Sequence, residues 1–137
     1  MSNHKVYLSL GTNLGDKEQN LIDALDRIEN EAGKVISRSS FYYSEPWGFE
    51  SDNSFVNICA LISTDLDPFK LLDALKAIEK QMGRDKKSTL SGYSDRIIDI
   101  DILLFDDQNI NTPELTVPHP LMTERDFVMK PLSEIME

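Results

Sequence analysis

The chain has 137 residues, of which 40% are hydrophobic, so it is long enough for one domain with a single core, expected over residues 1–137. It carries 14 basic and 24 acidic residues, and this net charge of −10 excludes nucleic acid and anionic membrane surfaces as expected partners. No apolar run reaches the roughly 18 residues of a membrane span, and the first residues do not resemble a secretory signal. A cytoplasmic protein is expected.

The first third of the chain predicts a strand, a helix and a second strand. Residues 6–10 alternate apolar and small polar side chains, which is the period of a half-buried strand. Asp16, with Gln19 three residues later, resembles a capping box, and apolar residues then recur at helical spacing until Gly33. Residues 34–44 are rich in β-branched and aromatic residues, which predicts one continuous strand.

The middle of the chain predicts a third strand and a second helix between two polar loops. Residues 45–54 form a loop of unusual length for a small domain, and such loops tend to be functional or disordered. A strand over 55–64 follows, and then a helix that begins at Asp67 with a proline in its first position and ends at Gly83. Residues 84–95 form the second polar loop.

The last third predicts a strand over 96–105, a short extended piece around 109–112 and a final helix. The resulting order β-α-β-β-α-β is that of the ferredoxin-like supersecondary pattern. The predicted fold class is therefore α+β, ferredoxin-like, with helices on one face of an antiparallel sheet and the active site on the other.

Two carboxylates alternate with apolar residues in the strand 96–105. Side chains alternate faces along a strand, so Asp99 and Asp101 are expected on one face, roughly 7 Å apart at Cα. The opposite, core face is expected to carry Ile98, Ile100, Ile102 and Leu104. Two close carboxylates repel each other unless a cation lies between them, and Mg²⁺ prefers such oxygen ligands. Alternatively, the two aspartates only solvate the open face of the sheet.

A local excess of positive charge precedes this strand. Arg84, Lys86, Lys87 and Arg96 place 4 of the chain's 14 cations within 13 residues. Guanidinium and ammonium groups opposite a metal-binding carboxylate pair would suit a polyphosphate ligand. The alternative is an ordinary solvated loop.

Two further features have both a functional and a structural interpretation. Pro118 and Pro120 fix the backbone around His119, upstream of Arg125, although a lone histidine is often structural. Phe55 and Asn57 share one face of their strand and could stack on, and hydrogen-bond to, a planar heterocycle. They could equally be a core residue and a polar residue at a strand edge.

Four segments together resemble one known family. They are Gly-Thr-Asn-Leu-Gly at 11–15, Phe-Val-Asn at 55–57, Arg-Ile-Ile-Asp-Ile-Asp at 96–101 and Val-Pro-His-Pro at 117–120. In order and spacing they are similar to those of 6-hydroxymethyl-7,8-dihydropterin pyrophosphokinases, and the resemblance extends from Val6 to about Ile135. It implies transfer of the pyrophosphoryl group of ATP to the hydroxymethyl group of a reduced pterin, with release of AMP, in folate biosynthesis. ATP and the pterin would be the partners of a monomeric enzyme that uses two Mg²⁺ ions.

The resemblance also implies a role for individual residues. Asp99 and Asp101 would be the Mg²⁺ ligands, Arg84 and Arg96 the catalytic cations, and the nucleotide site would include Glu79, Lys86, Ile102, Thr116, His119 and Arg125. Phe55 and Phe127 would sandwich the pterin, Asn57 would hydrogen-bond its edge, and Ser44, Trp47 and Tyr93 would complete its pocket.

Two other functions compete with this one. A ferredoxin-like module that only binds a ligand or a partner chain would have no use for two aspartates on one strand face. An ATP-dependent enzyme of the same architecture could act on a different heterocycle, and only the pocket of Phe55, Asn57 and Phe127 distinguishes that substrate from a pterin.

Overall fold

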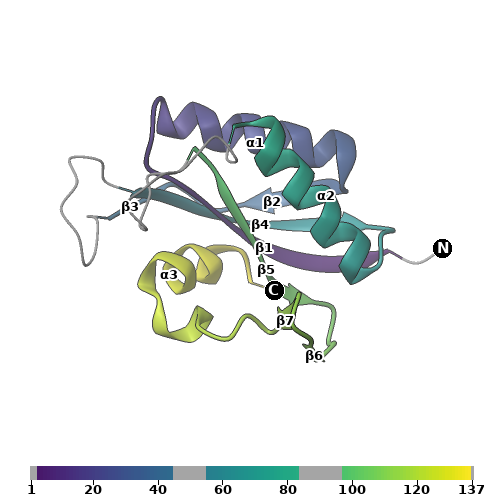
Figure 1. The fold of residues 1–137 in the computed structure, drawn as a ribbon. Helices are drawn as coiled ribbons and strands as arrows, with labels where there is room; N and C mark the ends of the chain where they lie inside the picture. The colour runs from purple at the N-terminus through teal and green to yellow at the C-terminus, as the bar shows by residue number, and fades with distance from the viewer. Residues whose placement is uncertain (1–2, 45–54, 84–96, 137) are drawn as a thin grey trace.

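A computed structural model of the chain describes residues 3–44, 55–83 and 97–136. These residues form an α+β fold with an antiparallel sheet and three α-helices (Figure 1). In chain order the elements are β1 (His4–Thr12), α1 (Lys17–Glu31), β2 (Lys34–Arg38), β3 (Tyr42–Ser44), β4 (Phe55–Thr64), α2 (Pro68–Gln81), β5 (Asp99–Phe105), β6 (Ile110–Asn111), β7 (Thr116–Val117), a 3₁₀ turn (Met122–Glu124) and α3 (Asp126–Ile135). No helix in these ranges is long and apolar enough to cross a membrane.

The main sheet has the strand order β2-β4-β1-β5, and every neighbouring pair is antiparallel. β3 continues along the same side of β4 as β2, and it pairs with the first residues of β4. β6 and β7 form a separate two-stranded ribbon. β1 and β4 are therefore central, while β5 lies at an edge of the main sheet.

Helices α1 and α2 cover one face of the sheet (Figure 1). Asp16 accepts a hydrogen bond from the backbone N–H of Gln19, and Asp67 accepts from those of Phe69 and Lys70, so both predicted N-caps are confirmed. The buried stripes of the two helices pack on strand residues such as Leu8, Leu10 and Ile58, all fully buried. This side of the sheet holds the main core.

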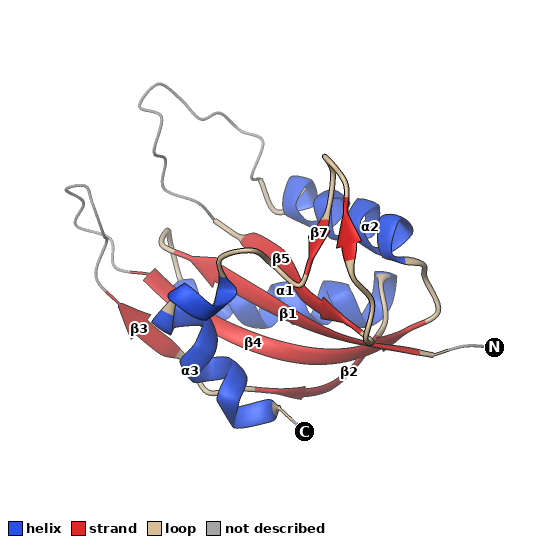
Figure 2. Cartoon of the chain, turned by 90° about the horizontal axis from the view of Figure 1, so that it is seen from below, coloured by secondary structure: helices blue, strands red, loops and turns tan. Residues whose placement is uncertain are grey.

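The prediction that helices occupy only one face is wrong, because α3 packs on the opposite face (Figure 2). Its buried residues Val128 and Leu132 form a second cluster with Cys59 of β4 and Leu103 of β5. Since a strand presents side chains to both faces, this apolar surface also needs a cover. α3 supplies the cover over β4 and leaves only part of the face for a site.

The predicted strand over 34–44 is interrupted between Arg38 and Tyr42. At the break the Ser39 hydroxyl accepts a hydrogen bond from the backbone N–H of Cys59 at 3.0 Å, while the Ser39 N–H donates to the Cys59 carbonyl at 2.9 Å. A serine side chain thus replaces a backbone acceptor of the ladder, which is the usual way that serine competes with regular structure.

The predicted strand over 96–105 begins at Asp99 and contains a β-bulge. Tyr7 lies opposite Leu104 while Leu8 lies opposite Ile102, so Leu103 is the extra residue. The bulge resets the alternation, and Leu104 packs with the α3 cluster instead of the main core. The expectation for Leu104 is therefore wrong, whereas Ile98, Ile100 and Ile102 lie in the main core as predicted.

Candidate active site

The register of β4, β1 and β5 brings the key polar residues into two rows across the sheet. Gly11 of β1 lies opposite Asn57 on one side and opposite Asp99 on the other. In the next row of this face, Ser9 lies between Cys59 and Asp101. Residues that face each other across a ladder share a face, so both aspartates and Asn57 lie on the α3 side of the sheet.

Asp99 and Asp101 are both half-buried, and each is flanked by buried isoleucines of the main core. The predicted alternation is confirmed for this part of β5. The aspartates therefore lie at the edge strand, on a face that α3 covers over β4.

Glu79 reaches β5 from the opposite face. It is one of the few buried polar residues of the described chain, 8% exposed, and its Oε2 atom accepts a hydrogen bond from the backbone N–H of Ile100 at 2.8 Å. Ile100 separates Asp99 from Asp101 in the sequence. The α2 carboxylate thus fixes the backbone of β5 at the residue between the two aspartates.

A cleft of about 360 Å³ follows β5 between α2 and the ribbon β6–β7. Six residues expected in the ATP and metal site line it: Glu79, Asp99, Asp101, Ile102, Thr116 and His119. Its walls also include apolar side chains, among them Leu72 and Leu115. A cleft lined by both carboxylates and apolar side chains can accommodate a ligand that has both a charged and a planar apolar portion.

His119 lines this cleft, and nearby charged groups affect its pKa. The backbone N–H of His119 donates to the Leu103 carbonyl at 3.0 Å, and its Nδ1 accepts from the backbone N–H of Leu121 at 3.3 Å. Burial lowers the pKa of His119 and the positive charge of Arg125 lowers it further, while the negative charge of Asp99 acts in the opposite direction. The guanidinium of Arg125 and the carboxylate of Asp99 therefore both act on His119, which lines the cleft.

Four of the residues expected to bind the heterocycle are described, and they lie on the same face but do not line the cleft. Ser44 of β3 pairs with Phe55 of β4. Asn57 follows Phe55 by two residues on the same strand, and its side chain is buried, with 6% of the residue exposed. Phe127 is half-buried against the α3 cluster, and the guanidinium of Arg125 lies 5.6 Å from the centre of its ring. Arg125 thus contacts the ring of Phe127 and also lowers the pKa of His119.

Comparison with known protein families gives a match over nearly the whole chain. The family model described as "7,8-dihydro-6-hydroxymethylpterin-pyrophosphokinase (HPPK)" matches residues 7–137. The chain belongs to the HPPK family.

Curated relatives support this assignment over nearly the whole chain. A 2-amino-4-hydroxy-6-hydroxymethyldihydropteridine pyrophosphokinase of Porphyromonas gingivalis is 46% identical over 131 residues, which cover 95% of this chain and 89% of the relative. The protein of the same name from Bacillus subtilis is 40% identical over 136 residues, covering 98% of this chain and 80% of that protein.

Solved structures share the fold at much lower sequence identity. An HPPK-DHPS of Plasmodium falciparum superimposes with a TM-score of 0.74 at 20% identity, over 96% of this chain. A second P. falciparum HPPK-DHPS structure gives a TM-score of 0.75 at 18% identity, again over 96% of the chain. This chain spans 40% and 38% of the length of those two chains, so the likeness concerns one part of each.

Five of the residues expected in an HPPK site lie outside the described residues. They are Trp47, Arg84, Lys86, Tyr93 and Arg96. Three of the described neighbours of these two segments lie close to expected site residues. Ser44 and Phe55 pair with each other, and Ile97 precedes Asp99 by two residues.

The structure adds residues to the cleft that the sequence analysis missed. Lys76 of α2 lines the cleft one helical turn before Glu79, and that i, i+3 spacing was a usable signal. Pro113, Glu114 and Leu115 line it from the β6–β7 connection, for which the sequence carried no signal, because their position depends on the ribbon packing beside β5.

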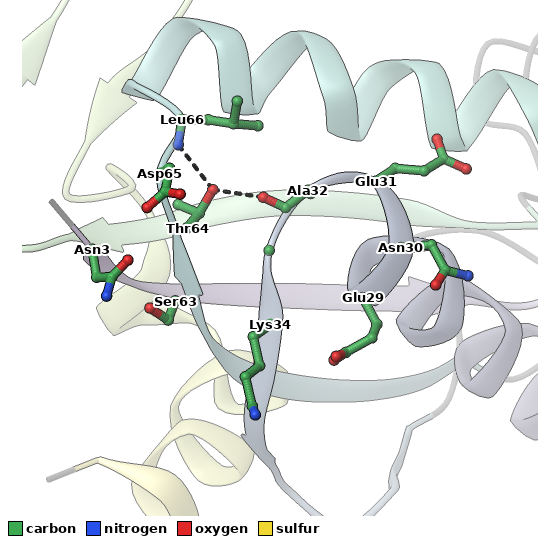
Figure 3. A pocket seen from close by; sticks show the side chains of 11 residues that line it. Asn3, Glu29, Asn30, Glu31, Ala32, Lys34, Ser63, Thr64, Asp65 and Leu66 are labelled. Atoms are coloured by element: carbon green, nitrogen blue, oxygen red, sulfur yellow. Dashed lines mark hydrogen bonds between the residues drawn. The ribbon is translucent and has the colours of Figure 1, made fainter. Parts of the chain in front are cut away.

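A second and larger cleft, of about 540 Å³, lies at the opposite end of the sheet (Figure 3). It lies where α1 ends and β2 begins, beside the last residues of β4, and its lining contains none of the expected HPPK site residues. The Thr64 hydroxyl donates to the Ala32 carbonyl at 2.6 Å and accepts from the backbone N–H of Leu66 at 3.1 Å (Figure 3). A Cβ on Gly33 would lie 2.5 Å from the Ser63 carbonyl oxygen, so this region is a tight structural junction.

Proposed function

We propose that this chain transfers the pyrophosphoryl group of ATP to 6-hydroxymethyl-7,8-dihydropterin, giving AMP and the pterin diphosphate, in folate biosynthesis. The observation that carries the proposal is the pair Asp99 and Asp101, on one face of β5 and in the wall of the cleft, within a chain whose residues 7–137 match the HPPK family. A carboxylate pair beside a mixed polar and apolar cleft is what a metal-dependent enzyme acting on a nucleotide requires.

Magnesium ions, two in number, would be held by Asp99 and Asp101. In the described ranges no group of three or more His, Cys, Asp or Glu side chains is placed to hold a metal. Two carboxylates still fit Mg²⁺, because this ion binds through one or two carboxylates together with substrate phosphates and water. When bound, it would neutralise the charge of the triphosphate.

The nucleotide would occupy the cleft beside β5. Ile102 and Thr116 line it, and we assign the adenine and ribose to this part, where Leu72 and Leu115 add apolar walls. We assign the phosphates to the part lined by Asp99, Asp101 and His119. The further cations of the phosphate site would be Arg84, Lys86, Arg96 and Arg125.

The pterin would lie over the row of residues that contains Asn57 and Asp99. Their α-carbons are separated by two interstrand spacings, about 10 Å in total, which suits a two-ring heterocycle with a hydroxymethyl arm. Asn57 would hydrogen-bond the ring edge, and Phe55 and Phe127 would stack on the ring. Ser44, Trp47 and Tyr93 would complete this pocket.

The reaction would consist mainly of positioning and charge stabilisation. The hydroxymethyl oxygen attacks the β-phosphorus, loses its proton, and the bond from that phosphorus to the α–β bridging oxygen breaks, so that AMP leaves. Asn57 and the aromatic rings would orient the acceptor, and Arg84 and Arg96 would stabilise the negative charge of the leaving group.

The fold itself supports a finer assignment. We propose that the sheet and helices α1 and α2 form a ferredoxin-like core. The order β2-β4-β1-β5, with a helix after β1 and another after β4, corresponds to that pattern. β3, the ribbon β6–β7 and α3 are additions to it.

Product analysis tests the proposed reaction. The protein, ATP, Mg²⁺ and 6-hydroxymethyl-7,8-dihydropterin are mixed and followed by ³¹P NMR. The expected products are AMP and a pterin diphosphate in equal amounts, without ADP. Accumulation of ADP with a pterin monophosphate would contradict transfer from the β-phosphorus, and absence of any product with pterin would contradict this acceptor.

A further inference from the structure

We propose that Gly11 is a positioning residue for the acceptor pocket, because its missing side chain leaves the space in which the Asn57 amide lies. The inference rests on the proposed function, since it assigns Asn57 to the pterin. It goes further in naming the residue of β1 that determines where that amide lies.

The first observation is steric. A Cβ atom built on Gly11 would lie 2.4 Å from Nδ2 of Asn57, 3.3 Å from its Cγ and 3.8 Å from its Oδ1. These are the three nearest heavy atoms, and all belong to Asn57. The amide therefore occupies the volume that any other residue at position 11 would fill with its side chain.

The second observation is the direction of the Asn57 side chain. Asn57 begins on β4, yet its Nδ2 atom lies over the α-carbon of Gly11 and 3.5 Å from the Leu10 carbonyl oxygen of β1. The side chain thus reaches from β4 to β1, the strand that lies between Asn57 and Asp99. It is almost completely buried, so the surrounding chain determines its orientation.

The consequence concerns recognition of a planar ring. An amide offers a donor and an acceptor in one plane, and it can read the edge of a heterocycle only from a defined position. Functional groups must be held within about 0.5 Å of their productive position. A methyl group at position 11 would displace the amide by more than this. The three atoms nearest to that methyl group all belong to Asn57 and none to Asp99, so the methyl group should leave Asp99 in place.

Gly11→Ala tests the proposal through the Michaelis constants of the two substrates. We expect the KM for the pterin to rise by at least about tenfold, and the KM for ATP to change by less than about twofold. Ile62→Val, a conservative change in the core near the other end of β4, is the control for lost stability and should leave both constants within about twofold. Equal increases in both constants for Gly11→Ala would overturn the proposal.

The double variant Gly11→Ala/Asn57→Ala separates positioning from packing, and it also covers the case in which Gly11→Ala alone does not fold. Removing the Asn57 amide removes the steric conflict, so the double variant should fold and bind the pterin as Asn57→Ala does, within about twofold. Pterin binding markedly weaker than that of Asn57→Ala would show that the methyl group acts on the pocket without Asn57, and would overturn the proposal.

A measurement without substrates distinguishes failure of this inference from failure of the proposed function. The side-chain amide signals of Asn57, assigned by their loss in Asn57→Ala, should exchange slowly with solvent in the unsubstituted protein. They should shift and exchange faster in Gly11→Ala but not in Ile62→Val, the control for lost stability. Unchanged signals would overturn the inference whatever the enzyme's substrate, whereas shifted signals without pterin-dependent activity would reject the proposed function alone.

Discussion

Glu79 of α2 accepts a hydrogen bond from the backbone N–H of Ile100, the residue between Asp99 and Asp101, with 2.8 Å between Oε2 and N. Because β5 is at the edge of the sheet, this backbone group faces away from β1 and needs an acceptor from another element. A buried carboxylate on a helix of one face therefore holds the backbone from which two carboxylates project to the other face.

Replacing Glu79 should destabilise the protein according to whether an acceptor oxygen remains. Glu79→Ala leaves the buried Ile100 N–H without this partner, which costs about 1–3 kcal/mol of unfolding free energy. Glu79→Gln keeps an oxygen at the same place and should lose less. Urea unfolding measures both, and an alanine variant as stable as the glutamine variant would contradict the role of this hydrogen bond.

Neutralising either aspartate of β5 should abolish most activity without unfolding the protein. Asp99→Asn and Asp101→Asn keep the shape of the side chain and remove the charge proposed to bind Mg²⁺. We expect turnover to fall by at least about 10²-fold, as for loss of one electrostatic catalytic group, with an unchanged far-UV circular dichroism spectrum.

Asp107→Asn is the matched control for the aspartate variants. Asp107 is an exposed carboxylate in the turn that follows β5, so its loss makes the same change in net charge. It should leave turnover unchanged. Near-normal activity in both Asp99→Asn and Asp101→Asn would contradict the proposal that these aspartates bind Mg²⁺.

Cys59 should be unreactive in the folded protein. Its side chain is fully buried under α3, with Sγ 3.5 Å from the Val128 carbonyl oxygen, and burial together with the negative charge of Glu134 raises the pKa of the thiol to about 12. The thiolate is the reactive form, so labelling by a disulfide reagent at pH 8 should require unfolding or release of α3.

Leu132→Ala provides a comparison for the thiol measurement. Leu132 is buried in the same cluster, and its truncation should cost about 2–5 kcal/mol and speed the labelling of Cys59. Rapid labelling of the unsubstituted protein without denaturant would contradict the packing of α3 on this face.

Asp106 should contribute to stability except in acid. One of its carboxylate oxygens lies 2.7 Å from Nδ1 of His4, and the other accepts from the backbone N–H of Lys5 at 2.8 Å. Burial raises the pKa of Asp106, but these hydrogen bonds and the positive charges of His4 and Lys5 lower it by more, so the net shift is below the ordinary value of 3.8. The unfolded chain therefore binds the proton more tightly, and the stabilisation is complete above pH 3.8 and is lost as the pH falls through the folded-state pKa.

Asp106→Asn tests this pH dependence. Position 106 has a positive φ of 51°, which asparagine tolerates, so the backbone should be retained. The variant should be less stable than the unsubstituted protein at pH 7, and the difference should shrink below about pH 4. A stability difference that is constant from pH 7 to pH 3 would contradict the prediction.

The sequence predicted those features that depend on local patterns. The N-caps at Asp16 and Asp67 and the alternation around Asp99 and Asp101 follow from side-chain chemistry and strand period, and the structure contains them. The bulge at Leu103 was not predictable, because an extra residue in one strand is defined only relative to its partner.

Features that depend on tertiary packing also escaped the sequence analysis. The sequence of α3 does not indicate which face of the sheet this helix covers. Lys76 and Leu115 line the cleft only because α2 and the β6–β7 ribbon lie beside β5. The contact between Gly11 and Asn57 likewise needs the register of β1 and β4, which the two motifs do not specify when read separately.

The central claim is that the chain transfers pyrophosphate to a reduced pterin, and the rate of AMP release tests it most directly. The purified protein is incubated with ATP and Mg²⁺, with and without 6-hydroxymethyl-7,8-dihydropterin. AMP should form only when the pterin is present, and should disappear again when Asp99 and Asp101 are both changed to asparagine. AMP release at the same rate without pterin, or none with it, would contradict the claim.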